Sequence, residues 1–168
     1  RYQLMADLFS GQRIPKMRGL RVTAIKGRYK NTNFYQFVSD AETLATLSYV
    51  QHRAKLNRDG EMSYQRLVSK SKLASIADYL NEDQIFPTNI VLNFQNSRPL
   101  VFEPAGLGEQ NEEGLTFGKL VLPDLFKSAW IIDGQHRLFS YFNKKVVNPS
   151  LKTRKQLPVV AFENLDKE

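Results

Sequence analysis

The stretch that decides the fold reads WIIDGQHRL and spans residues 130–138. Its apolar half predicts a buried strand at residues 129–133, and its polar half predicts a helix from Gln135 to about Lys144. Gly134 lies at the junction, where the absence of a Cβ allows a sharp turn and a close approach to the backbone. Because helix N-termini present unpaired N–H groups, this arrangement suits an anion.

Four polar side chains crowd the same turn. Arg137 offers a planar fork for two phosphate oxygens, and His136 can move a proton near neutral pH. Asp133 can hold magnesium or orient a water, while Gly134 and Gln135 can supply backbone N–H groups. The pattern predicts a site for phosphate oxygens. The spacing equally fits a plain turn, in which Asp133 caps the helix and Gly134 takes a positive φ.

Outward from this stretch, short strands and helices alternate irregularly. Strands are expected at residues 20–26, 33–38, 89–94, 100–102, 119–122 and 157–162, and helices at 2–9, 39–55 and 71–80. The helix after residue 39 starts at an expected capping box formed by Ser39 and Glu42. Residues 27–32 form a hairpin turn, and residues 103–118 form a glycine-rich loop. Because hairpins interrupt any βαβ alternation, the pattern favours an α+β fold.

Composition narrows the class of protein. A chain of 168 residues fits one domain, and its start at Arg1 leads us to expect part of a longer protein. The lack of cysteine excludes disulfides and thiolate metal sites and predicts a cytoplasmic protein. With only His52 and His136, no transition metal is expected. No apolar run approaches the ~20 residues of a membrane span, and no P-loop or G-x-G-x-x-G motif is present.

The net charge of +7 is unevenly distributed and points to phosphate-bearing partners. Residues 11–30 contain seven basic residues and no acid, and residues 144–155 contain five basic residues and no acid. An ordinary solvated surface explains such runs equally well. The candidate DNA-binding residues are Arg13, Lys16, Arg18, Arg21, Lys26, Arg28, Lys30, Lys144 and Lys145. Nearby aromatic residues can stack on bases, although core packing is the favoured interpretation for Tyr29, Phe34 and Tyr35.

Residues 133–137 resemble the signature of the DGQHR-domain family, whose relatives include DndB of DNA phosphorothioation systems. Shorter matching pieces follow in the family's order over roughly residues 17–163: Arg18-Gly19, Tyr64-Gln65-Arg66, Phe86-Pro87, Phe102-Glu103-Pro104, Gly118-Lys119-Leu120 and Leu157-Pro158-Val159-Val160. The resemblance implies a ParB/sulfiredoxin-like domain at residues 17–168, a mixed sheet with flanking helices. An N-terminal helix and basic loop at residues 1–16 would precede it, and the chain would continue in relatives.

The resemblance also implies roles for individual residues. Asp133, Gly134 and Arg137 correspond to the residues of the turn that face a nucleotide or DNA phosphate, and Gln65 and Arg66 line the same cleft. His136 stands where restriction-type relatives carry a second Gln, so this position departs from the relatives that hydrolyse nucleotides.

Three functions remain open at this point. The first is a component of a DNA-modification or phage-defence system that binds a nucleotide or DNA phosphate, with Mg²⁺ on Asp133 and NTP hydrolysis through Asp133, His136 and Arg137. The second is a non-catalytic DNA-binding regulator that contacts the phosphate backbone. The third is a nuclease with a second metal-binding carboxylate, for which the candidates are Glu103, Asp124 and Glu163. Other proteins of the modification system are expected partners.

Overall fold

The computed structural model describes residues 19–50, 69–95, 100–106, 114–124 and 127–165. Several expectations lie outside these ranges: the helix at residues 2–9, most of the basic loop, and the side chains of Arg13, Lys16, Arg18, His52, Tyr64, Gln65 and Arg66. The described elements are β1 (Arg21–Tyr29), β2 (Thr32–Ser39), α2 (Ala41–Leu47), β3 (Ser48–Tyr49), α3 (Lys70–Asn81), β4 (Ile90–Phe94), β5 (Phe102–Pro104), β6 (Thr116–Val121), β7 (Ala129–Asp133), α4 (Gln135–Ser140), the 3₁₀ helix η1 (Pro149–Lys152) and β8 (Leu157–Glu163).

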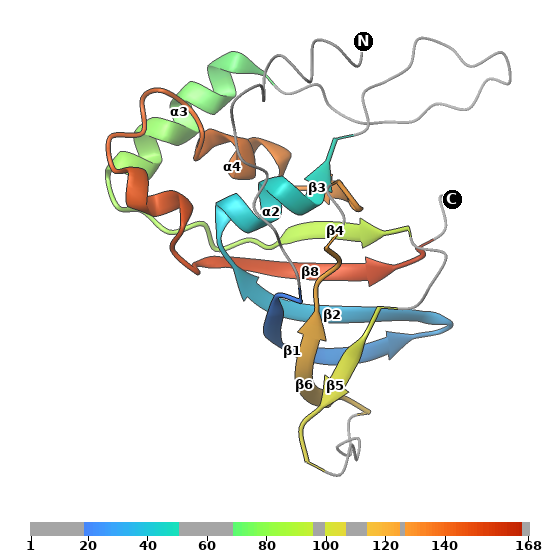
Figure 1. Cartoon of the computed structure of the whole chain (residues 1–168). Coiled ribbons are helices and arrows are strands. Elements are labelled where there is room, and N and C mark those ends of the chain that lie inside the picture. Colours follow the sequence, from blue (N-terminus) through green and yellow to red (C-terminus); the bar gives the residue numbers. More distant parts are fainter. Residues whose placement is uncertain (1–18, 51–68, 96–99, 107–113, 125–126, 166–168) are drawn as a thin grey trace, which may run out of the picture.

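The strands within the described ranges form one curled, mixed sheet. Its order is β3-β7-β4-β8-β2-β1-β6-β5, in which β3 pairs with β7 and β4 with β8 in parallel. The other neighbours are antiparallel. Figure 1 shows the helices gathered beside β3 and β4, whereas β1, β5 and β6 lie at the opposite end. The expected α+β class is therefore confirmed.

The core lies between the inner face of the sheet and the helices. Alternate residues of β8 are buried, as the period of two in a half-buried strand requires. Leu44 and Leu47 of α2 and Leu138 of α4 are fully buried in the same cluster. Each such side chain contributes about 1.5–3 kcal/mol of transfer free energy. The helices are thus fixed on the sheet by their apolar stripes.

The expected hairpin is confirmed, but its turn is shorter than predicted. The strands extend to Tyr29 and resume at Thr32, which leaves Lys30 in a left-handed conformation with φ of 51°. Gly27 lies inside β1 rather than in the turn, paired with Phe34, whose ring covers the space that a Cβ would need.

The start of α2 corrects the capping prediction. Asp40, not Ser39, caps the helix: its carboxylate accepts from the Thr43 backbone N–H at 2.7 Å and from the Thr43 hydroxyl at 2.9 Å. Ser39 is the buried last residue of β2. An aspartate in extended conformation reaches the third N–H of the helix as well as a serine does.

The end of α2 is also earlier than predicted. The helix stops at Leu47 instead of continuing to Lys55, because Ser48 and Tyr49 pair with Ala129 and Trp130 of β7. The Ser48 hydroxyl donates to the Leu44 carbonyl and so occupies an acceptor at the end of the helix. The competing partner, β7, is distant in sequence.

The end of α4 is a third correction. This helix ends at Ser140 rather than Lys144, and Phe142 and Asn143 form tighter i to i−3 hydrogen bonds with Phe139 and Ser140. The Ser140 hydroxyl donates to the Arg137 carbonyl at 2.7 Å and so occupies an acceptor that the next turn of an α-helix would use.

The other predicted ends of helices and strands differ less from the observed ones. The helix expected at residues 71–80 is confirmed as α3, and β7 begins and ends as predicted. Residues expected to form a loop at 103–118 instead contribute to β5 and to the first half of β6. Gly118 belongs to β6, where it pairs with Ala24 and Pro104, and the backbone of Glu103 and Pro104 passes too close to it for a side chain.

Candidate functional site

The turn between β7 and α4 is a sharp corner packed against β4. Gly134 adopts φ of 95°, which residues with a Cβ rarely adopt. A Cβ there would lie 2.6 Å from Ile90 Cδ1 and 3.2 Å from an Arg137 guanidinium nitrogen. The space beside the glycine, where a phosphate was expected, is thus occupied by two side chains of the same chain.

Arg137 is held by partners within the chain. One terminal nitrogen of its guanidinium donates to the Thr88 carbonyl at 2.6 Å and also to the Thr88 hydroxyl. The other donates to Asp133 at 3.1 Å. The arginine side chain is only 15% exposed, whereas that of Asp133 is 71% exposed. The guanidinium expected to bind phosphate therefore joins the segment that precedes β4 to the end of β7.

His136 and Gln135 also face the protein. His136 Nε2 accepts a hydrogen bond from the Ser69 backbone N–H at 3.1 Å. The contact joins α4 to the residue that precedes α3. The side chain of Gln135 is buried, which leaves its backbone, rather than its amide, as the group that could meet a ligand.

The carboxylates proposed for a metal lie in different places. Glu103 pairs with Arg21 at 3.0 Å on the strands at the far edge of the sheet. Glu163 is buried and accepts from Tyr35 at 3.0 Å and Asn33 at 3.1 Å. Asp124 is exposed. Over the described ranges, no group of three or more His, Asp or Glu side chains could hold a metal ion.

Asp133 is thus a single carboxylate already paired with an arginine. Such a donor set does not form a metal site by itself, because Mg²⁺ bound through one carboxylate also depends on substrate phosphates and water.

The basic residues of β1 separate onto two faces of the sheet. Arg21 lies on the outer face, and its hydrogen bond to Glu103 raises the pKa of the guanidinium. Lys26 has the opposite strand parity and lies over the ring of Phe102, 5.8 Å from its centroid. Arg28 donates to the Lys30 carbonyl at 3.1 Å. A run that is continuous in sequence is therefore divided by the alternation of a strand.

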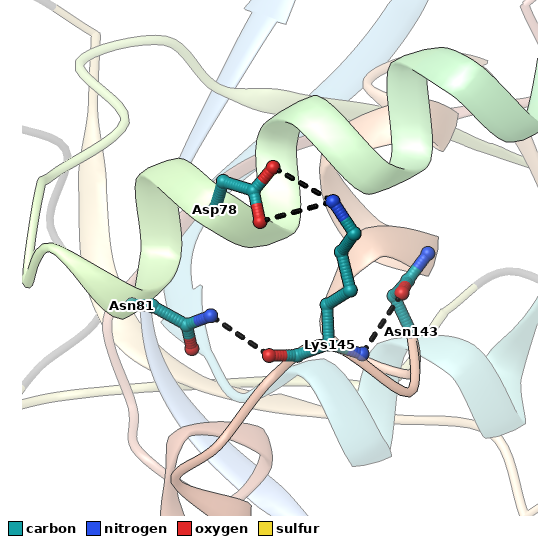
Figure 2. A network of polar contacts seen from close by, with 4 residues as sticks. All are labelled: Asp78, Asn81, Asn143 and Lys145. Atoms are coloured by element: carbon teal, nitrogen blue, oxygen red, sulfur yellow. Dashed lines mark hydrogen bonds and ion pairs between the residues drawn. The ribbon is translucent and has the colours of Figure 1, made fainter.

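Lys145 belongs to a polar network between α3 and the segment after α4 (Figure 2). Its ammonium pairs with Asp78 at 3.0 Å, and its carbonyl accepts from Asn81 at 2.8 Å. Its backbone N–H donates to Asn143 at 3.0 Å. The charge of Lys145 is thus partly offset, whereas Lys144 is exposed.

A groove that the sequence did not predict lies on the outer face of β1, β2, β6 and the start of β8. Its volume is about 660 Å³, and its lining includes Arg21, Gln36, Val38, Phe117, Lys119 and Lys155. The hydrogen-bonding register explains the grouping, since Phe117 lies opposite Ile25 and Lys119 opposite Thr23. Phe117 was expected in the loop at residues 103–118; the signal that could have placed it on a strand is the alternation of Phe117 and Lys119 with residues that are buried in β6.

Comparison with protein-family models identifies the family to which the chain is related. The model described as DndB, DNA-sulfur modification-associated, matches residues 22–168. The chain belongs to the DndB family. Comparison with curated proteins and with solved structures gave no match. The family match covers the curled sheet of this DndB-family chain from Val22 onward, including the corner at Gly134 and the residues that line the groove except Arg21.

Within the described ranges, no helix of the DndB-family chain has the length and apolar character that crossing a bilayer requires.

Proposed function

We propose that this DndB-family chain is a non-catalytic DNA-binding component of a DNA-sulfur modification system. In this proposal the corner at residues 133–137 is a structural joint. The observation that carries it is the environment of Arg137. Its guanidinium is hydrogen-bonded to Thr88 and paired with Asp133, and Ile90 fills the space beside Gly134. An anion site needs free donors and room for the anion. At this corner the Arg137 guanidinium is already paired, and Ile90 occupies the space beside Gly134.

The DNA-binding part of the proposal is supported by charge. The chain carries a net charge of +7, and cations within the described ranges lie on the outer face of the sheet as well as on the hairpin end. A protein that neutralises phosphates with Lys and Arg releases counterions from DNA, so its affinity depends strongly on salt.

The test is a salt titration of binding to a DNA duplex, followed by fluorescence anisotropy. The logarithm of the affinity should fall linearly with the logarithm of salt concentration, with a slope of about −0.9 for each phosphate neutralised. A slope near zero, or no binding at low salt, would contradict the proposal.

A second candidate is nucleotide hydrolysis at the corner, which the 71% exposure of Asp133 favours. Asp133 would then share Mg²⁺ with the phosphates of an NTP, and Arg137 and His136 would turn toward the nucleotide. The residues Gln65 and Arg66 belong to the same candidate, as the resemblance implies.

Two variants separate the candidates. Under the structural proposal, purified protein with Mg²⁺ and NTP releases no phosphate, and Arg137→Ala lowers stability without changing nucleotide affinity. Under the hydrolytic candidate, phosphate is released by the wild type, and Asp133→Asn abolishes the release while the protein remains folded.

The remaining parts of the proposal follow from the family. A ParB/sulfiredoxin-like origin is supported by the mixed sheet and by the glycine–arginine corner between a strand and a helix. The protein would act together with other members of a DNA-sulfur modification system and with DNA. A cytoplasmic location agrees with this role and with the lack of cysteine.

A further inference from the structure

We propose that the groove on the outer face of β1, β2 and β6 binds single-stranded DNA, with a base stacked on Phe117 and phosphates against Lys119 and Lys155. This inference rests on the proposed DNA binding and adds the place and the strandedness of the ligand.

The groove is a face of the sheet that the described helices leave open. Burial alternates in the first half of β1 and along β6, so that Val22, Ala24 and Leu120 point to the core while Thr23, Phe117 and Lys119 point outward. Figure 1 shows the helices beside β3 and β4, at the other end of the sheet from β1 and β6. A volume of about 660 Å³ is within the range of ligand-binding clefts.

The charge of the groove suits a polyanion. The residues that line it include Arg21, Lys119 and Lys155 and no carboxylate. Arg21 is offset by its ion pair with Glu103. Lys119 donates to the Thr23 hydroxyl at 2.6 Å, and within the described ranges neither Lys119 nor Lys155 has an ion-pair partner. Two positive charges therefore remain for phosphate.

The apolar side chains of the groove indicate an unpaired strand. Phe117 is 58% exposed and Val38 is 50% exposed, although both lie on regular strands. A duplex keeps the faces of its bases stacked inside and offers an aromatic ring on a sheet nothing to stack on. A single strand exposes every base, and stacking on an aromatic side chain is tolerant of sequence. Gln36, exposed beside them, can hydrogen-bond to a base edge.

The chain offers a matched control on another face. Phe142 is also an exposed aromatic residue, 38% exposed, and the ammonium of Lys152 lies 5.4 Å from its ring centroid. Phe142→Ala and Lys152→Gln therefore remove the same chemical groups as Phe117→Ala and Lys119→Gln, but outside the groove.

The experiment measures binding of a labelled mixed-sequence oligonucleotide and of its duplex by fluorescence anisotropy at several salt concentrations. Phe117→Ala should weaken single-strand binding about 5-fold to 150-fold, and Phe117→Trp should preserve it. Lys119→Gln and Lys155→Gln should each reduce the magnitude of the single-strand salt slope by about 0.7. Phe142→Ala and Lys152→Gln should change neither quantity, and unfolding midpoints should show that all variants are folded.

The outcomes distinguish this inference from the function on which it rests. If the wild type binds DNA but the groove variants bind as tightly as the controls, the groove is not the site and DNA binding stands. If Phe117→Ala weakens duplex and single-strand binding equally, the strandedness is wrong. If the groove variants lose only the binding of a partner protein, the groove is a protein interface and the inference is wrong. Failure of the wild type to bind either DNA form overturns both proposals.

Discussion

At the scale of single residues, the corner between β7 and α4 is determined by the backbone conformation of Gly134 and by the hydrogen bonds of Arg137. Gly134 allows a conformation with φ of 95° and lets Ile90 pack directly on the backbone. Arg137 then closes the corner by joining the Thr88 carbonyl to Asp133. The residue types expected for phosphate chemistry are thus the same types that a tight, hydrogen-bonded corner requires.

Substitution of Gly134 should separate backbone strain from steric exclusion. Gly134→Ala is expected to lower the free energy of unfolding by about 2–4 kcal/mol, because a left-handed alanine costs roughly 1–2 kcal/mol and the new Cβ collides with Ile90. Gly114→Ala is the control, since Gly114 has φ of 75° but nothing within 4 Å of its ideal Cβ. Urea denaturation measures both, and equal losses would show that Ile90 does not restrict the corner.

At the scale of elements, α3 is attached by side-chain contacts to the segment that follows α4. Asn81, the last residue of α3, donates to the Lys145 carbonyl at 2.8 Å and accepts from the Val147 N–H at 3.0 Å. Asp78, one turn earlier, pairs with the Lys145 ammonium in an exposed position (Figure 2). The Asn81 amide forms hydrogen bonds with two backbone groups, whereas the ion pair of Asp78 and Lys145 joins two solvated side chains.

These two contacts should differ in energy. Asn81→Ala is expected to cost about 1–3 kcal/mol, because it removes two hydrogen bonds that each contribute about 0.5–1.5 kcal/mol. Lys145→Met is expected to cost less than about 1 kcal/mol, as exposed ion pairs do. Thermal unfolding of the two variants decides the order. A larger loss for Lys145→Met would mean that the ion pair, not the amide, attaches α3.

At the scale of the whole molecule, a buried carboxylate joins parts of the sheet that are far apart in sequence. Glu163 of β8 accepts from Tyr35 and Asn33 of β2 and, at 2.6 Å, from the Leu100 N–H that precedes β5. Burial first, and then the Glu163 charge, raise the pKa of Tyr35 above its ordinary value of 10. The curled sheet is therefore fixed at this end by one charge with three donors.

Tyr35→Phe should reveal this network in two ways. At neutral pH the variant should be about 1.5–3 kcal/mol less stable, because a charged acceptor loses a buried donor. Above a pH of about 10 the unfolded chain releases the Tyr35 proton while the folded chain retains it, so wild-type stability falls with rising pH. Urea titrations from pH 7 to 11 should show a smaller alkaline decline in Tyr35→Phe.

The matched control is Tyr29→Phe, since Tyr29 is 67% exposed. This variant should keep wild-type stability at neutral pH and retain the alkaline decline. An identical pH dependence in wild type and Tyr35→Phe would contradict the assignment.

Local sequence determined the helices and strands whose residues are not drawn into pairing with distant segments. The strand at 129–133 and the helix at 70–81 follow from apolar periodicity, and the hairpin follows from two β-rich segments with a polar turn. The composition of residues 133–137 also determined a strand–glycine–helix corner. These features depend on interactions within a few residues, which a single sequence displays.

Tertiary structure decided the rest, because it depends on partners that are distant in sequence. The helix after Asp40 stops at Leu47 since Ser48 and Tyr49 pair with β7, about eighty residues later. The role of Arg137 depends on Thr88, and the basic run of β1 divides because alternate side chains point to opposite faces. Phe117, Lys119 and Lys155 come together only when β6 and β8 join the same sheet. Periodicity shows which side of a strand faces outward, but only strand order shows what lies beside it.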